Sequence, residues 1–173
     1  MSDDEDLQVA GVPRAGSQER IYWIAAAVGA VPFVAILGWA AHSCAKQHTA
    51  AVVAEVPLDG LERPAERAVK LDEGAELLFA IATDYSFSGN PMVRLDVTLL
   101  AGTAEVASKS CKMKGFTGIG ASGSGGNTWY GDGGWTCTLI VPAGGATAIR
   151  ASTRNTGDGS ITLTHTEVIV KRL

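Results

Sequence analysis

Residues 92–100, MVRLDVTLL, indicate the fold more clearly than any other segment of this chain. Apolar residues, from Val93 to Leu99, alternate strictly with polar residues, from Arg94 to Thr98. This period of two predicts a β-strand that has one face in a hydrophobic core and the other in water.

Similar patterns lie on both sides of that segment. We predict strands at residues 68–71, 76–83, 103–110, 136–141, 146–153 and 161–170, with a further one at 52–56. Turn-forming Gly, Pro, Asn and Asp separate them. In the last strand the apolar phase changes between Leu163 and Val168, which indicates a β-bulge. Short strands without a helical period predict an all-β fold: an antiparallel β-sandwich or jelly roll of about eight strands.

A long apolar segment precedes the predicted sandwich. Residues 21–41, IYWIAAAVGAVPFVAILGWAA, contain no charged residue, and a spanning helix needs roughly 20 apolar residues. Trp23 and Trp39 lie near its two ends, where the headgroups of a bilayer favour such rings. We therefore predict an acidic cytoplasmic tail at 1–20, a single transmembrane α-helix at 21–44, a linker at 45–65 and an extracytoplasmic sandwich at 66–173.

The predicted β domain resembles jelly-roll modules appended to bacterial exported proteins. The resemblance rests on VKLDEGAELLF at residues 69–79 and SITLTHTEVIV at residues 160–170. These segments are general β patterns, so the resemblance implies a fold class and no specific activity.

The expected location is a bacterial inner membrane, with the N-terminus cytoplasmic and the C-terminal domain periplasmic or extracytoplasmic. Two arginines precede the apolar segment and Lys46 follows it, a bias that weakly favours this orientation. Two alternatives stay open, because the sequence AHS before Cys44 is compatible with signal cleavage or with lipid attachment to Cys44.

Small residues on the apolar segment are compatible with helix packing. Ala25 and Gly29 are four positions apart, a spacing that lets a second helix approach closely. The alternative is the ordinary content of an alanine-rich helix. A packing role would make the protein an accessory subunit of a larger membrane complex.

Two of the three cysteines lie within the predicted sandwich. We predict a disulfide between Cys111 and Cys137, which would require an oxidising compartment. The alternative is two buried free thiols. No paired Cys-x-x-Cys motif is present and the domain contains only His165, so we expect no metal and no other cofactor.

A glycine-rich segment separates these cysteines, KMKGFTGIGASGSGGNTWYGDGGW at residues 112–135. It contains a formal G-x-G-x-x-G motif, but no helix is predicted after it, so nucleotide binding is not expected. We expect a recognition loop with the binding residues Phe116, Trp129, Tyr130 and Trp135, because rigid aromatic rings on a flexible backbone are typical of binding surfaces. The alternative is that these rings fold back over the sandwich.

Charge and composition exclude some classes of function. A net charge of −4 argues against nucleic-acid binding. No pairing of a nucleophile with a base is evident, so we expect no enzyme; a hydrolase using Asp84, Asp96, Asp132 and Glu167 is a weaker alternative. The predicted function is a membrane-anchored binding module without catalytic activity, and the alternative is the accessory subunit. Expected partners are the lipid bilayer, a protein in the membrane or periplasm, and a carbohydrate.

Overall fold

The computed structural model describes residues 49–118, 120–132 and 136–173. The chain divides into two units, residues 1–45 and residues 46–173. The predicted tail, transmembrane helix and helix-packing residues Ala25 and Gly29 lie outside the described residues, as does Cys44. Within the part that is described, no helix is long and apolar enough to cross a membrane.

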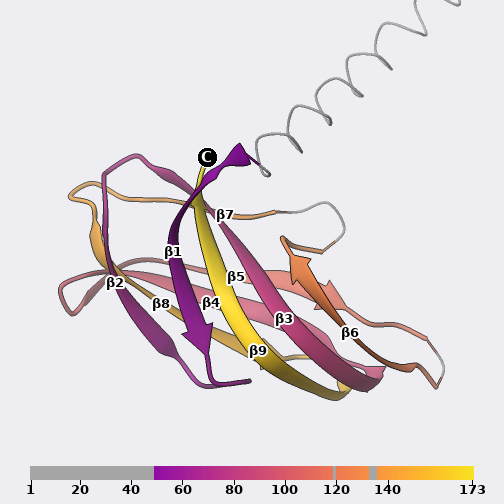
Figure 1. The fold of residues 1–173 in the computed structure, drawn as a ribbon. Helices are drawn as coiled ribbons and strands as arrows, with labels where there is room; N and C mark the ends of the chain where they lie inside the picture. Colours follow the sequence, from indigo (N-terminus) through magenta and orange to yellow (C-terminus); the bar gives the residue numbers. More distant parts are fainter. Residues whose placement is uncertain (1–48, 119, 133–135) are drawn as a thin grey trace, which may run out of the picture. The chain divides into compact units, whose positions relative to one another are not determined.

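Antiparallel β-strands make up most of the second unit, which confirms the predicted all-β sandwich class (Figure 1). The described residues form nine strands: β1 Ala51–Leu58, β2 Ala65–Leu71, β3 Glu76–Asn90, β4 Met92–Ala101, β5 Ala104–Gly115, β6 Ser122–Trp129, β7 Cys137–Ile140, β8 Ala146–Asn155 and β9 Asp158–Arg172.

The strands form two sheets that face each other. One sheet has the order β1-β9-β3-β6, with β7 also paired to β3, and the other has the order β2-β8-β4-β5. In Figure 1 the first sheet lies in front of the fainter strands β4, β5 and β8. β7 pairs with residues 76–79 of β3 and β6 pairs with residues 81–88. These two strands therefore follow one another along β3 and occupy a single strand position.

The sandwich begins earlier than the sequence predicted. β1 lies within residues 45–65, which were expected to be a linker, yet it pairs with β9 from Ala51↔Arg172 to Leu58↔Thr166. β1 includes the further strand predicted at residues 52–56, and it is an edge strand of the first sheet. Its exposed positions are mostly Ala, Glu and Pro, so its apolar alternation is weaker in the sequence than that of β4.

The core lies between the two sheets. The inward residues of β4, from Val93 to Leu99, are fully buried, as the strict alternation predicted. They pack in one cluster with Phe79 of β3 and Ile149 of β8. Each large apolar side chain buried in this way contributes about 1.5–3 kcal/mol to folding. The core therefore stabilises the two sheets, and the loops and sheet edges around it are where a site can form.

Candidate functional site

Two of the four predicted binding aromatics are part of the core. Phe116 is 8% exposed and Trp129 is 5% exposed. They pack with Tyr85 and Phe87 of β3, with ring centroids 4.2 Å apart for Phe87 and Phe116 and 5.3 Å apart for Tyr85 and Trp129. These separations are close to those typical of stabilising aromatic pairs. The positions of Phe116 and Trp129 agree with the alternative in which the rings cover the sandwich.

The other two predicted binding aromatics are Tyr130 and Trp135. Tyr130 is partly buried, and the Nζ atom of Lys171 lies 5.4 Å from its ring centroid. Trp135 lies outside the described residues. A ligand-binding role for any of the four aromatics stays a prediction.

A strand that the sequence did not predict explains how the aromatic cluster forms. β6 has the sequence SGSGGNTW and runs through the segment expected to be irregular. Its Gly123 and Gly125 lie directly opposite Phe87 and Tyr85. A Cβ atom on Gly125 would lie 3.2 Å from the Tyr85 hydroxyl, and one on Gly123 would lie 3.0 Å from the Phe87 ring. The glycines leave room for the two rings to cover the strand, an arrangement that stabilises glycine at sheet edges.

The predicted disulfide between Cys111 and Cys137 is confirmed. The two Cα atoms are 5.7 Å apart and both cysteines are buried. The bond links β5 of one sheet to β7 of the other, so it fixes both ends of the glycine-rich segment to the sandwich.

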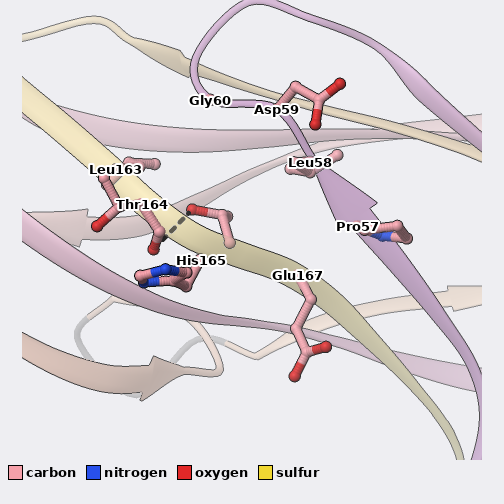
Figure 2. A pocket seen from close by; sticks show the side chains of 9 residues that line it. Pro57, Leu58, Asp59, Gly60, Leu163, Thr164, His165 and Glu167 are labelled. Carbon is pink, nitrogen blue, oxygen red and sulfur yellow. Dashed lines mark hydrogen bonds between the residues drawn. The ribbon is translucent and has the colours of Figure 1, made fainter.

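An open cavity with both polar and apolar lining lies at a different place, where β1 ends beside β9 (Figure 2). We name it the bulge notch: about 550 Å³ between residues 57–60 and residues 163–167. The β1–β9 pairing stops at Thr166, whereas β9 extends back to Asp158 and pairs there with β3. The notch therefore exists because β1 is shorter than the strand it pairs with.

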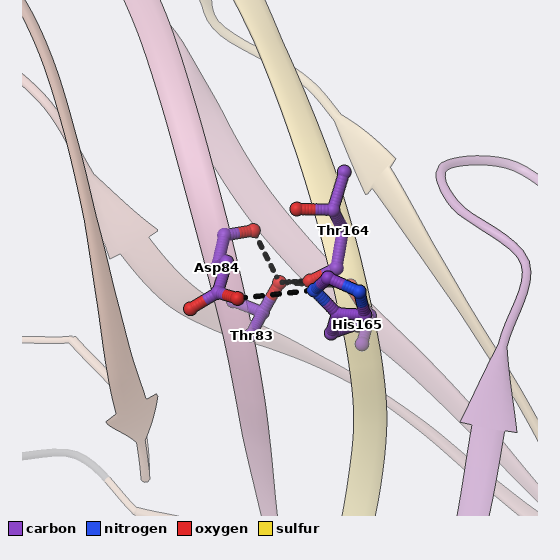
Figure 3. Close-up of polar contacts among 5 residues, drawn as sticks. Thr83, Asp84, Thr164 and His165 are labelled. Atoms are coloured by element: carbon purple, nitrogen blue, oxygen red, sulfur yellow. Dashed lines mark hydrogen bonds and ion pairs between the residues drawn. The ribbon is translucent and has the colours of Figure 1, made fainter.

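His165 is the most unusual residue of the notch. Its backbone φ is 48°, in the left-handed region, and the β3–β9 register shifts beside it, between Ala82 and Asp84. This is the β-bulge that the phase change in the sequence indicated. The imidazole is 87% exposed, and its Nδ1 lies 3.1 Å from Oδ2 of Asp84 (Figure 3). A left-handed conformation costs a non-glycine residue about 1–2 kcal/mol, and such strain clusters at functional sites.

Two buried threonines support the bulge from inside. The Oγ1 atoms of Thr83 and Thr166 are 2.8 Å apart. The Thr83 hydroxyl donates to the carbonyl oxygen of Asp84 at 2.9 Å, and the carbonyl oxygen of Thr164 is a second acceptor at 3.3 Å. These hydrogen bonds are partly buried, and a hydrogen bond of this kind contributes about 0.5–1.5 kcal/mol to folding. The threonines thus fix the backbone on which His165 is presented.

The sheet face next to the notch is covered by hydroxyl groups. Successive residues along a strand point to opposite faces. The side chains of Tyr85, Phe87, Ile161 and Leu163 point inward, so the residues next to them in sequence point outward. Strand pairing places these neighbours in rows across three strands, for example Thr162, Ser86 and Ser124. We name this surface the hydroxyl face; all its members are exposed: Ser86, Ser88, Ser122, Ser124, Ser160, Thr162 and Thr164.

The carboxylates considered for a hydrolase are divided between two places. Asp84 pairs with His165, and Glu167 lines the same notch. Asp96 and Asp132 instead form ion pairs with basic residues of the other sheet. Among the described residues, no three His, Cys, Asp or Glu side chains are grouped as metal ligands.

Comparison with known proteins gives little further information. No protein-family model and no curated protein matches this sequence. Among solved structures, the chain is similar to one titled "Structure of infectious bursal disease virus Gx strain", with a TM-score of 0.30 and 11% sequence identity. The match covers 69% of this chain and 31% of the viral chain. A similarity at this TM-score supports no conclusion about fold or function.

Proposed function

We propose that this protein is a non-catalytic, membrane-anchored binding module built on a jelly roll. A jelly roll has eight strands in two sheets, and the sandwich has eight strand positions when β6 and β7 are counted as one. The chain also passes between the two sheets at most of its connections, which is consistent with this class. The bulge notch is the binding site, and His165 is its central residue.

The strained backbone of His165 is the observation that supports this site. A glycine would adopt the same φ without steric cost, and the exposed imidazole adds no packing to the core. The histidine therefore weakens the fold locally, so its ring has a role outside folding. Contact with a ligand in the notch is such a role, because the ring lies at the cavity wall.

The chemistry around the notch favours a neutral carbohydrate. Asp59 and Glu167 line it and Asp84 lies beside it, so the carboxylates can accept hydrogen bonds but repel anions. Sugar hydroxyls donate such bonds, and the adjoining hydroxyl face can both donate to and accept from further hydroxyls. Pro57 supplies an apolar contact for a sugar ring. A basic peptide is the competing ligand and is one outcome of the test below.

The apolar segment at 21–41 and the disulfide support the proposed location. The first has the length of a membrane span, and the second persists in an oxidising compartment. An inner-membrane anchor with the sandwich in the periplasm satisfies both. A protein partner that packs on Ala25 and Gly29 remains a separate proposal.

Replacing His165 with glycine is expected to raise the stability of the fold and to weaken ligand binding. The free energy of unfolding should rise by about 0.5–1 kcal/mol, because relief of left-handed strain exceeds the entropic cost of glycine. Little is lost with the Asp84 contact, since both side chains are exposed. Binding of the full chain, in detergent, to a panel of immobilised neutral oligosaccharides should fall at least about ten-fold, equivalent to roughly 1.4 kcal/mol.

Ser108→Ala is the matched control, because Ser108 is exposed on β5 of the other sheet, outside both the notch and the hydroxyl face. It should leave both stability and binding unchanged. Equal binding by the parent and by His165→Gly would remove His165 from the site. Binding of basic peptides but of no oligosaccharide by the parent would overturn the carbohydrate proposal.

A further inference from the structure

Three basic residues lie in one row across the second sheet, on the side away from the core. Arg94 of β4 is directly opposite Lys112 of β5 and directly opposite Arg154 of β8. Like charges opposite each other destabilise a sheet. A row of this kind needs negative charge to offset it.

Carboxylates supply that charge to the two outer cations only. The Nζ atom of Lys112 lies 2.8 Å from Oδ2 of Asp132, and the Nε atom of Arg154 lies 2.8 Å from Oδ2 of Asp96. These pairs are substantially exposed, so each is weak and can exchange with a better ligand.

Arg94, the central cation, has no such partner. No ion pair joins it to any described residue within 4.0 Å, and its Nε atom is buried without a hydrogen-bond acceptor in the described part of the chain. A buried donor without an acceptor is unfavourable, and more so on a charged group. The row is therefore short of one anion, at its centre.

We infer that Arg94, Lys112 and Arg154 form a binding site for a phosphate or sulfate group. A tetrahedral oxyanion has enough oxygen atoms to accept hydrogen bonds from three strands at once, whereas a carboxylate has two. Arginine binds such groups through paired N–H donors. This site lies on the sheet opposite the bulge notch, so it goes beyond the proposed function and does not depend on it. A cleft of about 490 Å³ adjoins Lys112 and can take the remainder of a larger ligand.

The test is calorimetric titration of the full chain, in nanodiscs of phosphatidylcholine, with inorganic phosphate at constant ionic strength. Arg94→Gln should weaken phosphate binding at least about ten-fold, because a charge-assisted pair is lost. Asp96→Asn should strengthen binding by about three-fold, since it frees Arg154 from a competing carboxylate. Arg67→Gln, which removes an exposed arginine from β2, should leave the affinity unchanged.

The Asp96→Asn result separates a binding site from a merely structural ion network. A network that only supports the sheet would lose stability in this variant without gaining affinity for phosphate. The inference is overturned if the parent binds phosphate no better than chloride, or if Arg94→Gln binds it as tightly as the parent. If phosphatidylglycerol in the nanodisc competes with inorganic phosphate, the ligand is a lipid headgroup. If phosphatidylglycerol does not compete, the ligand is a soluble phosphate.

Discussion

Replacement of both Cys111 and Cys137 with alanine is expected to lower the free energy of unfolding by about 3.5 kcal/mol, the chain-entropy value for a loop of about 27 residues. The midpoint of thermal unfolding should fall by roughly 10–15 °C for a domain of this size. The loss is large because the bond joins β5 to β7 across the two sheets and closes a loop of about 27 residues that includes β6. Chemical denaturation followed by circular dichroism measures it.

Reduction of the parent protein under denaturing conditions is the control for this variant. Reduced parent and double variant should unfold at nearly the same denaturant concentration, apart from the small packing difference between cysteine and alanine. A double variant as stable as the oxidised parent would contradict the expected contribution of the bond. Both cysteines are buried, so we also expect the native protein to resist reduction.

Replacement of Trp129 with alanine is expected to cost about 3–5 kcal/mol, the range for truncation of a buried aromatic residue. Trp129 is 5% exposed and contacts Tyr85 and Phe116 of the aromatic cluster, so its loss leaves a cavity at one edge of the core. Total stabilities of such domains are about 5–15 kcal/mol. Part of the purified variant should therefore be unfolded at physiological temperature.

Tyr130→Ala is the comparison for Trp129→Ala, because the neighbouring ring is only partly buried. It should cost clearly less in the same denaturant titration. If Trp129→Ala instead kept the parental unfolding midpoint and lost ligand binding, the ring would be a binding residue. The expectation of a recognition loop would then be correct for this position.

Strands with a sharp alternation were predictable from the sequence. Residues 92–100 alternate because one side of β4 is completely buried, and burial of one face produces such a pattern directly. The bulge in β9 was predictable for the same reason: an extra residue shifts the apolar phase, and the shift is visible between Leu163 and Val168. The pairing of Cys111 with Cys137 followed from their positions in the predicted domain.

Features that depend on pairing between distant strands were not predictable. β6 consists largely of glycine and serine, and it is a strand because β3 pairs with it and because Tyr85 and Phe87 cover it. The notch depends on where β1 ends relative to β9. The row of basic residues depends on a register shift that brings Arg94 opposite Lys112 while Val93 is opposite Lys114. None of these relations is visible within one segment.

The position of β9 in the sheet has a consequence for how the chain matures. β9 is the last of the described strands in sequence order, yet it lies between β1 and β3 and pairs with both. Contacts between residues so distant in sequence form slowly, and sheet assembly cannot finish before β9 is available. A chain still being synthesised therefore has an incomplete first sheet until the 15 residues of β9 are available. On the proposed extracytoplasmic location, we expect the domain to complete its fold only after β9 has crossed the membrane.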